Sequence, residues 1–199
     1  AEVILLGPAP DDSVELLGRY GASKVYRSMD PVFREYLTLP AVVVVESLIR
    51  KHGPSAVLFA SSYNGRDVAA ALSASLDCGA ITDVADFTLT NGTVEAKIPA
   101  LGASYWNTST LVHDDVKLLL VRPKAFEATE SPKNPEVEEI TPTDDADLRK
   151  IRVKDRVAAK AEGPQLEGAK VIVSGGRGLA GPEHFDMLRE LAELLGGAV

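Results

Sequence analysis

Short apolar runs alternate with amphipathic segments through the first part of the chain. Residues 3–6 form an apolar run that ends at Gly7-Pro8, which is typical of an interior strand closing in a loop. The Asp-Asp-Ser sequence at residues 11–13 can cap a following helix, and residues 24–26 form a second short strand. This order of strand, helix and strand predicts a parallel α/β unit.

The same kind of unit is then repeated. Residues 40–51 predict a helix in spite of a run of valines, because Leu48 and Ile49 continue its apolar face and a His-Gly-Pro sequence ends it. Residues 56–60 predict an apolar strand. Residues 65–77 predict a helix with one apolar stripe.

After this helix the hydrophobic period changes to two. Residues 84–90 and 93–98 flank Asn91-Gly92, which is a strong hairpin signal because both turn residues accept positive φ. Residues 116–121 predict a further buried strand. The predicted fold class is therefore α/β, with a largely parallel sheet and an antiparallel hairpin extension.

A connector follows, marked by a shift of composition to Pro, Glu, Thr and Ser from residue 127 onward. Within it, residues 137–141 are expected to pair with residues 150–157 across a turn at Asp144-Asp145. The second of these runs alternates apolar with basic residues, which is typical of a half-buried strand with a solvated basic face.

A second α/β domain is expected to begin at Ala169. Residues 170–174 predict its first strand, a Gly-Gly-Arg-Gly sequence predicts a tight loop, and residues 182–195 predict an amphipathic helix. The predicted organisation is an N-terminal α/β domain at 1–126, a connector with a strand pair at 127–168, and the first strand and helix of a second domain at 169–199.

Charge and cysteine content exclude several classes of function. The formal net charge is −8, so anionic nucleic acids and anionic membrane surfaces would repel the chain. Cys78 is the only cysteine, which rules out an internal disulfide and a cysteine-based zinc site and fits a reducing compartment. The longest apolar run, residues 41–45, is too short to span a bilayer. The chain opens inside a strand without a visible signal peptide, which leads us to expect missing upstream sequence.

The loop after residues 170–174 carries the clearest chemical signal. Glycines let backbone amides approach a ligand, and the following helix directs its positive dipole end to the same place. Arg177 adds a fixed charge and a planar group that can stack on, or hydrogen-bond to, a cofactor ring. We therefore take Arg177 and Gly176 as candidate cofactor-binding residues. A tight turn with a surface arginine remains the alternative, and the spacing does not match a dinucleotide-binding fingerprint.

The sequence around this loop resembles the opening of the FAD domain in electron transfer flavoprotein alpha subunits. The Ser-Gly-Gly-Arg-Gly sequence at residues 174–178 is the most specific part of the resemblance. The resembling segments follow one another along nearly the whole chain, at residues 20–25, 65–69, 81–84, 121–126, 168–179, 181–185 and 188–199.

The resemblance implies a heterodimer of alpha and beta subunits that carries electrons from flavin dehydrogenases to an acceptor. It implies a Rossmann-like first domain packed on a beta-subunit counterpart, and FAD bound mainly by sequence beyond this chain, with Arg177 touching it. The flavin would supply the chemistry, so no catalytic residue and no metal are expected. The expected location is the cytoplasm of a bacterium or the mitochondrial matrix of a eukaryote.

The chain also departs from the family's pattern. The family has an initial strand and helix before the segment that Ala1 begins, and further FAD-domain segments after Val199. Residues 101–107 lack the small-residue turn usual at that place. We therefore expect this polypeptide alone to bind FAD weakly or not at all.

Other residues allow different interpretations. Residues 61–67 lie at a strand-to-helix turn where a nucleotide phosphate could bind, although Asn64 as a helix cap explains them better. His52, His113 and His184 are scattered over different elements and give no metal-binding spacing. The alternative function is a non-redox nucleotide-binding or structural assembly module on the same scaffold.

Overall fold

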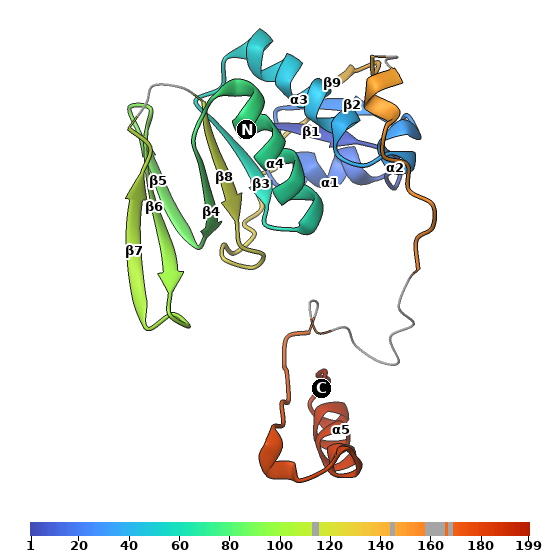
Figure 1. Ribbon diagram of the computed structural model, residues 1–199, viewed down its shortest axis with the longest axis vertical. Helices are drawn as coiled ribbons and strands as arrows, with labels where there is room; N and C mark the ends of the chain where they lie inside the picture. The colour runs from blue at the N-terminus through green and yellow to red at the C-terminus, as the bar shows by residue number, and fades with distance from the viewer. Residues whose placement is uncertain (113–115, 144–145, 158–165, 167–168) are drawn as a thin grey trace. The chain divides into compact units, whose positions relative to one another are not determined.

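The computed structural model describes residues 1–112, 116–143, 146–157, 166 and 169–199 (Figure 1). Contacts divide the chain into two compact units, Ala1–Lys154 and Asp155–Val199. The predicted connector at 127–168 is thus shared between the two units, and the predicted domain boundaries stay predictions.

A parallel three-stranded sheet opens the first unit. It contains β1 (Glu2–Leu6), β2 (Lys24–Ser28) and β9 (Glu136–Glu139), in the order β1-β2-β9. Helix α1 (Ser13–Arg19) joins the first two strands, which confirms the predicted strand–helix–strand unit.

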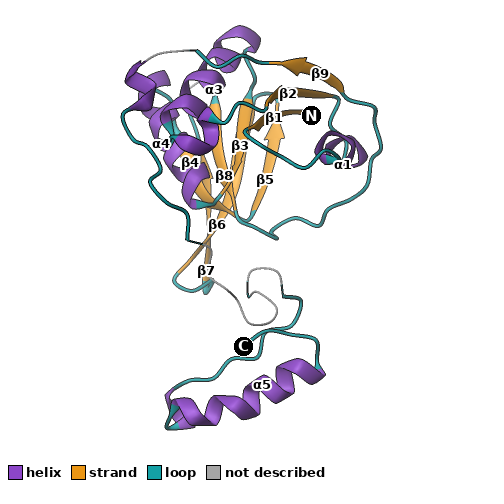
Figure 2. Cartoon of the chain, turned by 90° about the vertical axis from the view of Figure 1, so that its right-hand side faces the viewer, coloured by secondary structure: helices purple, strands orange, loops and turns teal. Residues whose placement is uncertain are grey.

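A second parallel sheet has the order β3-β8-β4. Its strands are β3 (Ala56–Ala60), β8 (Lys117–Val121) and β4 (Ala80–Val84). Helices α3 (Leu39–His52) and α4 (Tyr63–Leu76) lie on one side of these strands (Figure 2). Both helices and the strands β3 and β8 were predicted within two residues of their observed bounds, whereas β4 was not predicted as a separate strand.

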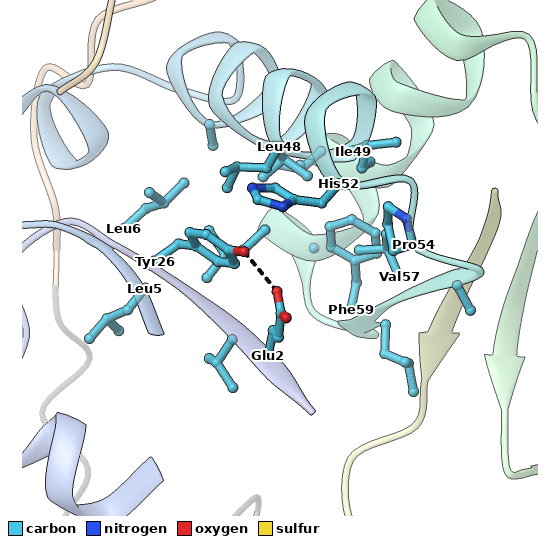
Figure 3. Close-up of a pocket in the computed structure, with 18 of the residues that line it drawn as sticks. Glu2, Leu5, Leu6, Tyr26, Leu48, Ile49, His52, Pro54, Val57 and Phe59 are labelled. Carbon is cyan, nitrogen blue, oxygen red and sulfur yellow. Dashed lines mark hydrogen bonds between the residues drawn. The ribbon is translucent and has the colours of Figure 1, made fainter. Parts of the chain in front are cut away.

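The hydrophobic core of the first unit forms where these elements meet. Strand β8 lies between two neighbours, and its three leucines are almost fully buried. One side of the core packs residues of α3 and α4 against strand residues, among them Val42, Val45, Ile49, Leu72 and Leu118. Residues of β1 and β3 pack against the same cluster (Figure 3), so the two parallel sheets, where one largely parallel sheet was predicted, share a helical layer.

The antiparallel extension has three strands, in the order β5-β6-β7. The predicted hairpin is confirmed as β5 (Asp86–Thr90) and β6 (Thr93–Ala100), with Asn91 and Gly92 at φ of 51° and 81°. Strand β7 (Tyr105–Thr110) adds a third strand that the sequence analysis missed. Tyr105 and Trp106 on this strand are exposed.

The predicted pairing of residues 137–141 with residues 150–157 is wrong. Strand β9 pairs in parallel with β2 instead, so that Val137 lies opposite Val25. In the second run, Arg152 forms an isolated antiparallel bridge with Tyr36, next to the short helix α2 (Val32–Glu35). The expected turn at Asp144-Asp145 lies outside the described residues, and η1 (Ala146–Arg149) follows it.

Opposite charges lie across the pair of β2 and β9. Lys24 on β2 lies 3.2 Å from a carboxylate oxygen of Glu136 and 2.8 Å from one of Glu138, and Lys51 of α3 also reaches Glu138 at 3.1 Å. Hydrogen bonds donated by Lys24 and then by Lys51 lower the pKa of Glu138 to about 2. The same contacts with Glu138 and Glu136 raise the pKa of Lys24 above its ordinary value. An acidic strand is thus paired with a basic neighbour.

The second unit contains little regular structure. It has two single-turn 3₁₀ helices, η2 (Arg177–Leu179) and η3 (Pro182–His184), followed by α5 (Phe185–Leu194). The strand predicted at residues 170–174 is reduced to one parallel bridge between Ile172 and Ala198. The predicted helix at 182–195 is present, with its first turn in 3₁₀ form.

None of the helices among the described residues is long and apolar enough to cross a membrane.

Candidate functional site

The glycine-rich loop predicted to bind a cofactor lies between the Ile172 bridge and helix α5. On one side, the amide of Val173 donates to the carbonyl of Ala198 at 2.8 Å, and the amide of Ala198 donates to the carbonyl of Val171 at 2.9 Å. On the other side, the loop closes into η2, where the amide of Leu179 donates to the carbonyl of Gly176 at 3.0 Å. The loop is therefore fixed at both ends.

The glycines of this unit serve two different purposes. A Cβ atom at Gly175 would lie 2.3 Å from a methyl carbon of Leu179 and 2.5 Å from one of Leu188, so this glycine permits close packing beneath the loop. A Cβ atom at Gly176 or Gly178 would meet no atom of the described chain within 4 Å. Gly176 and Gly178 thus mark the open side of the loop, where a ligand can approach the backbone.

Hydrogen-bond donors are available on that open side. Within the described part of the chain, the amides of Gly176, Arg177 and Gly178 donate no hydrogen bond to a protein acceptor. Three successive amides without a protein acceptor are donors that a phosphate or carbonyl oxygen could accept from. The sequence analysis named Gly176 but not Gly178, and the open surroundings of Gly178 are visible only in the structure.

Arg177 begins the 3₁₀ turn and is exposed. Its guanidinium makes no ion pair or hydrogen bond to any described residue, whereas Arg189 of the same unit is paired with Asp186. Arg177 therefore remains available to a ligand, and its planar group can hydrogen-bond to or stack on a ring. The structure places Arg177 and Gly176 together, as expected from their adjacency.

Helix α5 presents apolar side chains without covering them. Ala192 is its only buried residue among those described, while Met187, Leu191 and Leu194 are exposed by 62%, 46% and 86%. A helix that leaves such side chains in water gains little from burial. The second unit therefore holds its glycine-rich loop by hydrogen bonds, while its helix α5 buries few apolar side chains.

The competing candidates of the sequence analysis have structural explanations. At the turn after β3, the hydroxyl of Ser62 accepts a hydrogen bond from the amide of Gly65 at 3.1 Å, so Ser62 and not Asn64 caps α4. Arg66 in the first turn of α4 donates to the hydroxyl of Ser61 at 3.1 Å. These contacts account for the turn without a nucleotide.

The histidines also give no common site. His52 packs on Tyr26, His184 lies 3.6 Å from a carboxylate oxygen of Glu183, and His113 lies outside the described residues. Searched over the described residues alone, the chain shows no group of three or more His, Cys, Asp or Glu side chains able to hold a metal.

Comparison with known proteins covers almost all of the chain. Residues 1–145 match the family model of the electron transfer flavoprotein domain, and residues 165–199 match that of the electron transfer flavoprotein FAD-binding domain.

Individual relatives agree with these matches. The chain is 31% identical over 198 residues to the electron transfer flavoprotein subunit alpha of Bacillus subtilis, covering 98% of this chain and 60% of that protein. It is 32% identical over 197 residues to the subunit of the same name from Syntrophomonas wolfei, covering 98% of this chain and 62% of that protein. Protein FixB of Clostridium saccharobutylicum is 29% identical over 192 residues, covering 94% of this chain and 57% of that protein. The chain thus spans about three fifths of the length of these relatives, and it belongs to the electron transfer flavoprotein alpha-subunit family.

Proposed function

We propose that this chain forms part of an electron carrier that holds FAD and works as the alpha half of an alpha/beta heterodimer. Electrons would pass from flavin dehydrogenases through the bound FAD to an acceptor. The chain's own side chains would transform no substrate, and a reducing compartment, such as the cytoplasm for a bacterial protein, would suit its single buried cysteine.

The observation that carries this proposal is the open loop at Gly176, Arg177 and Gly178. Among the described residues, it combines amides without a protein acceptor, a cation without a protein partner and space on one side, which together fit an anionic cofactor with a flat ring. The FAD-binding family model covers this segment. Bound FAD would supply the reversible uptake and release of electrons, while the loop would hold the cofactor and tune it by charge.

The first test replaces Arg177 with alanine in the full-length subunit, co-expressed with its beta subunit. We expect weaker binding of FAD, seen as more FAD lost on dialysis, or a shifted reduction potential of the bound FAD. The reason is that a positive charge stabilises the electron-rich, reduced flavin. The matched control is Arg189→Ala, which removes an exposed arginine of the same unit that is paired with Asp186. An unchanged visible spectrum, FAD affinity and potential in Arg177→Ala would contradict the assignment.

A second test uses the open surroundings of Gly176. Gly176→Val places a side chain in empty space at a φ of −135°, which a branched residue adopts readily. We expect normal folding by circular dichroism and reduced FAD content. Equal FAD content in parent and variant would show that ligand does not approach on this side.

The alternative function is tested on the same preparations. A shift of the unfolding temperature by AMP or ATP, with none by FAD, would favour a nucleotide-binding module that carries no electrons. Failure to isolate a beta subunit with the tagged alpha subunit would contradict the heterodimer. Reduction of the complex by a flavin dehydrogenase with its substrate would test the proposed electron donors.

A further inference from the structure

Two asparagines of the chain are followed directly by a glycine. The chain has four asparagines, and Asn64 and Asn91 each precede a glycine. The backbone nitrogen of a glycine can attack the preceding asparagine side chain because no Cβ atom shields it. This attack closes a cyclic imide, a succinimide, and releases ammonia. The two Asn-Gly pairs are therefore candidate sites of spontaneous deamidation, the loss of the side-chain amide.

The other two asparagines precede residues that hinder this reaction. Asn107 on β7 is followed by Thr108, whose branched side chain crowds the attacking nitrogen. Asn134 is followed by Pro135, and proline has no amide proton to lose. The comparison that matters is thus between the two Asn-Gly pairs.

The two pairs differ in the hydrogen bonding of the attacking nitrogen. Asn64 and Asn91 are both exposed, so access of water does not separate them. The amide of Gly65 donates to the hydroxyl of Ser62 at 3.1 Å, in the bond that caps α4. The amide of Gly92, by contrast, donates to no protein acceptor among the residues that the structure describes. Attack by Gly65 therefore requires the loss of a hydrogen bond, whereas attack by Gly92 does not.

The space around the two glycines differs in the same direction. A Cβ atom at Gly65 would lie 2.1 Å from the carbonyl oxygen of Ala60, so the backbone there is closely enclosed. A Cβ atom at Gly92 would meet no described atom within 4 Å. Closing the imide requires rotation about ψ of the asparagine, which moves the glycine. Gly92 has room for this movement and Gly65 has not.

The two backbones also differ in how easily they open. Asn64 lies in the first turn of α4, where Leu72 is fully buried, so a change of ψ at Asn64 disturbs a packed helix. Asn91 lies in the turn between β5 and β6, with φ of 51°. The pair Thr90–Thr93 is the last of the ladder beside this turn. Opening the end of a hairpin costs far less free energy than opening a packed helix.

We propose that Asn91 is a site of spontaneous deamidation in the folded protein and that Asn64 is protected from it. The nitrogen of Gly92 bonds to Cγ of Asn91, and the carboxamide nitrogen leaves as ammonia with the proton that Gly92 gives up. Water then opens the succinimide at either carbonyl, which yields aspartate or isoaspartate. The reaction consumes water alone, and each event adds one negative charge to the chain.

The isoaspartate product disturbs the hairpin more than the aspartate product. In isoaspartate the main chain runs through the former side chain, which adds one carbon to the turn. The length of a hairpin turn fixes the register of its strands. Val94 and Ala96 of β6 are fully buried in a core cluster with Leu119 of β8. A shift at the turn therefore reaches the core, and we expect chains with isoaspartate at residue 91 to unfold at a lower temperature.

The test incubates the folded 199-residue chain in heavy-oxygen water at mildly alkaline pH, which speeds loss of the amide proton. Mass spectrometry of its peptides then locates the heavy oxygen, which marks deamidation that occurred during incubation. We expect Asn91 to react at least about tenfold faster than Asn64, with isoaspartate among its products. The control is the same chain in denaturant, where both Asn-Gly pairs should react at similar rates.

Two variants locate the origin of the difference. Ser62→Ala removes the acceptor for the amide of Gly65, so deamidation at Asn64 should rise by about threefold or more while that at Asn91 stays the same. Asn91→Gly retains a residue that accepts positive φ in the turn and removes the reacting amide, so the folded variant should gain almost no charge. If Asn91→Gly fails to fold, peptide mapping of the parent chain decides.

The proposal fails if the folded chain loses its amide at Asn64 as fast as at Asn91, because the fold would then select no site. It also fails if Asn91 keeps its amide in the folded chain over a time in which the denatured chain loses it. Aspartate without isoaspartate at residue 91 would exclude the succinimide and the attack by Gly92. An unchanged rate at Asn64 in Ser62→Ala would refute protection by the capping hydrogen bond.

Discussion

Strand β8 and the segment around Ile172 are similar in sequence and very different in structure. Residues 117–121 read KLLLV and residues 170–174 read KVIVS, so both predict an apolar strand. Strand β8 pairs with β3 and β4, and Leu118 and Leu119 are fully buried. The Ile172 segment has a single bridge to Ala198, and Ile172 is 55% exposed.

The difference shows that an apolar pattern predicts a strand only as far as neighbours are present to pair with it. A strand gains hydrogen bonds from its two neighbours and buries its side chains under the layers above and below. Strand β8 has both kinds of neighbour among the described residues. The Ile172 segment has one short partner segment, at Ala198, and one helix in its unit. Its apolar sequence therefore forms a single bridge and no longer strand.

We expect the largest effect from shortening an apolar side chain in each of these two regions and comparing the loss in the free energy of unfolding. Leu118→Ala should lower the free energy of unfolding of the first unit by about 2–5 kcal/mol, because it leaves a cavity between two packed layers. Ile172→Ala should cost less than about 1 kcal/mol, since its side chain is already half in water. Urea unfolding followed by circular dichroism measures both. Similar losses in the two variants would mean that the Ile172 segment is packed in solution.

A second comparison uses two glycines at strand-to-helix turns. A Cβ atom at Gly65 would lie 2.1 Å from the carbonyl oxygen of Ala60, so Gly65→Ala should destabilise the first unit by about 1–3 kcal/mol. This cost exceeds the gain of about 1 kcal/mol from helix propensity. Gly176→Ala enters open space and should leave stability nearly unchanged. A neutral Gly65→Ala, measured by thermal unfolding, would show that the turn can relax.

A third comparison concerns the starts of α4 and α5. Ser62→Ala removes the hydroxyl that caps α4 and should cost about 1 kcal/mol. His184 precedes α5 and makes no capping hydrogen bond, so His184→Ala should have little effect on helix content. Denaturant unfolding of both variants checks the expectation. A large loss for His184→Ala would point to a contact of His184 outside the capping position.

The smallest expected effect is electrostatic and depends on pH. The folded pKa of Glu138 is lowered to about 2 from an ordinary value of 4.5, so its contribution to stability is present above pH 4.5 and is lost as the pH falls toward 2. Glu138→Gln should therefore lower the unfolding temperature most above pH 5, with the gap closing toward pH 2. Asp186→Asn in the second unit controls for loss of a surface carboxylate. A gap independent of pH would contradict the role of the Lys24–Glu138 pair.

The parts of the fold that sequence predicted best are those governed by local rules. The helix at Leu39–His52 follows from its apolar face and the Gly53 that ends it, and the Asn91-Gly92 hairpin follows from turn chemistry. The partner of β9 could not be predicted in this way. It pairs with β2, where Lys24 contacts Glu138, and β2 lies more than a hundred residues earlier in the chain.

The same distinction applies to the candidate site. The sequence predicted that Arg177 and Gly176 lie on one loop, because strand, glycines and helix follow each other directly. It could not separate Gly175, which packs under Leu179, from Gly178, which borders open space. That separation depends on which side of the loop the helix covers, and residue type alone does not determine it.

The position of β9 has a consequence for how the first unit folds. Arg27 and Glu139 are hydrogen-bonded although 112 residues separate them, whereas Ser23 bonds to Ala1 across 22 residues. Bringing distant segments together costs more chain entropy and slows folding. Strands β1 and β2 can therefore form early, while their sheet is completed last. During synthesis, a nascent chain that has not yet reached residue 136 holds Lys24 without its two carboxylate partners and β2 with only one neighbour.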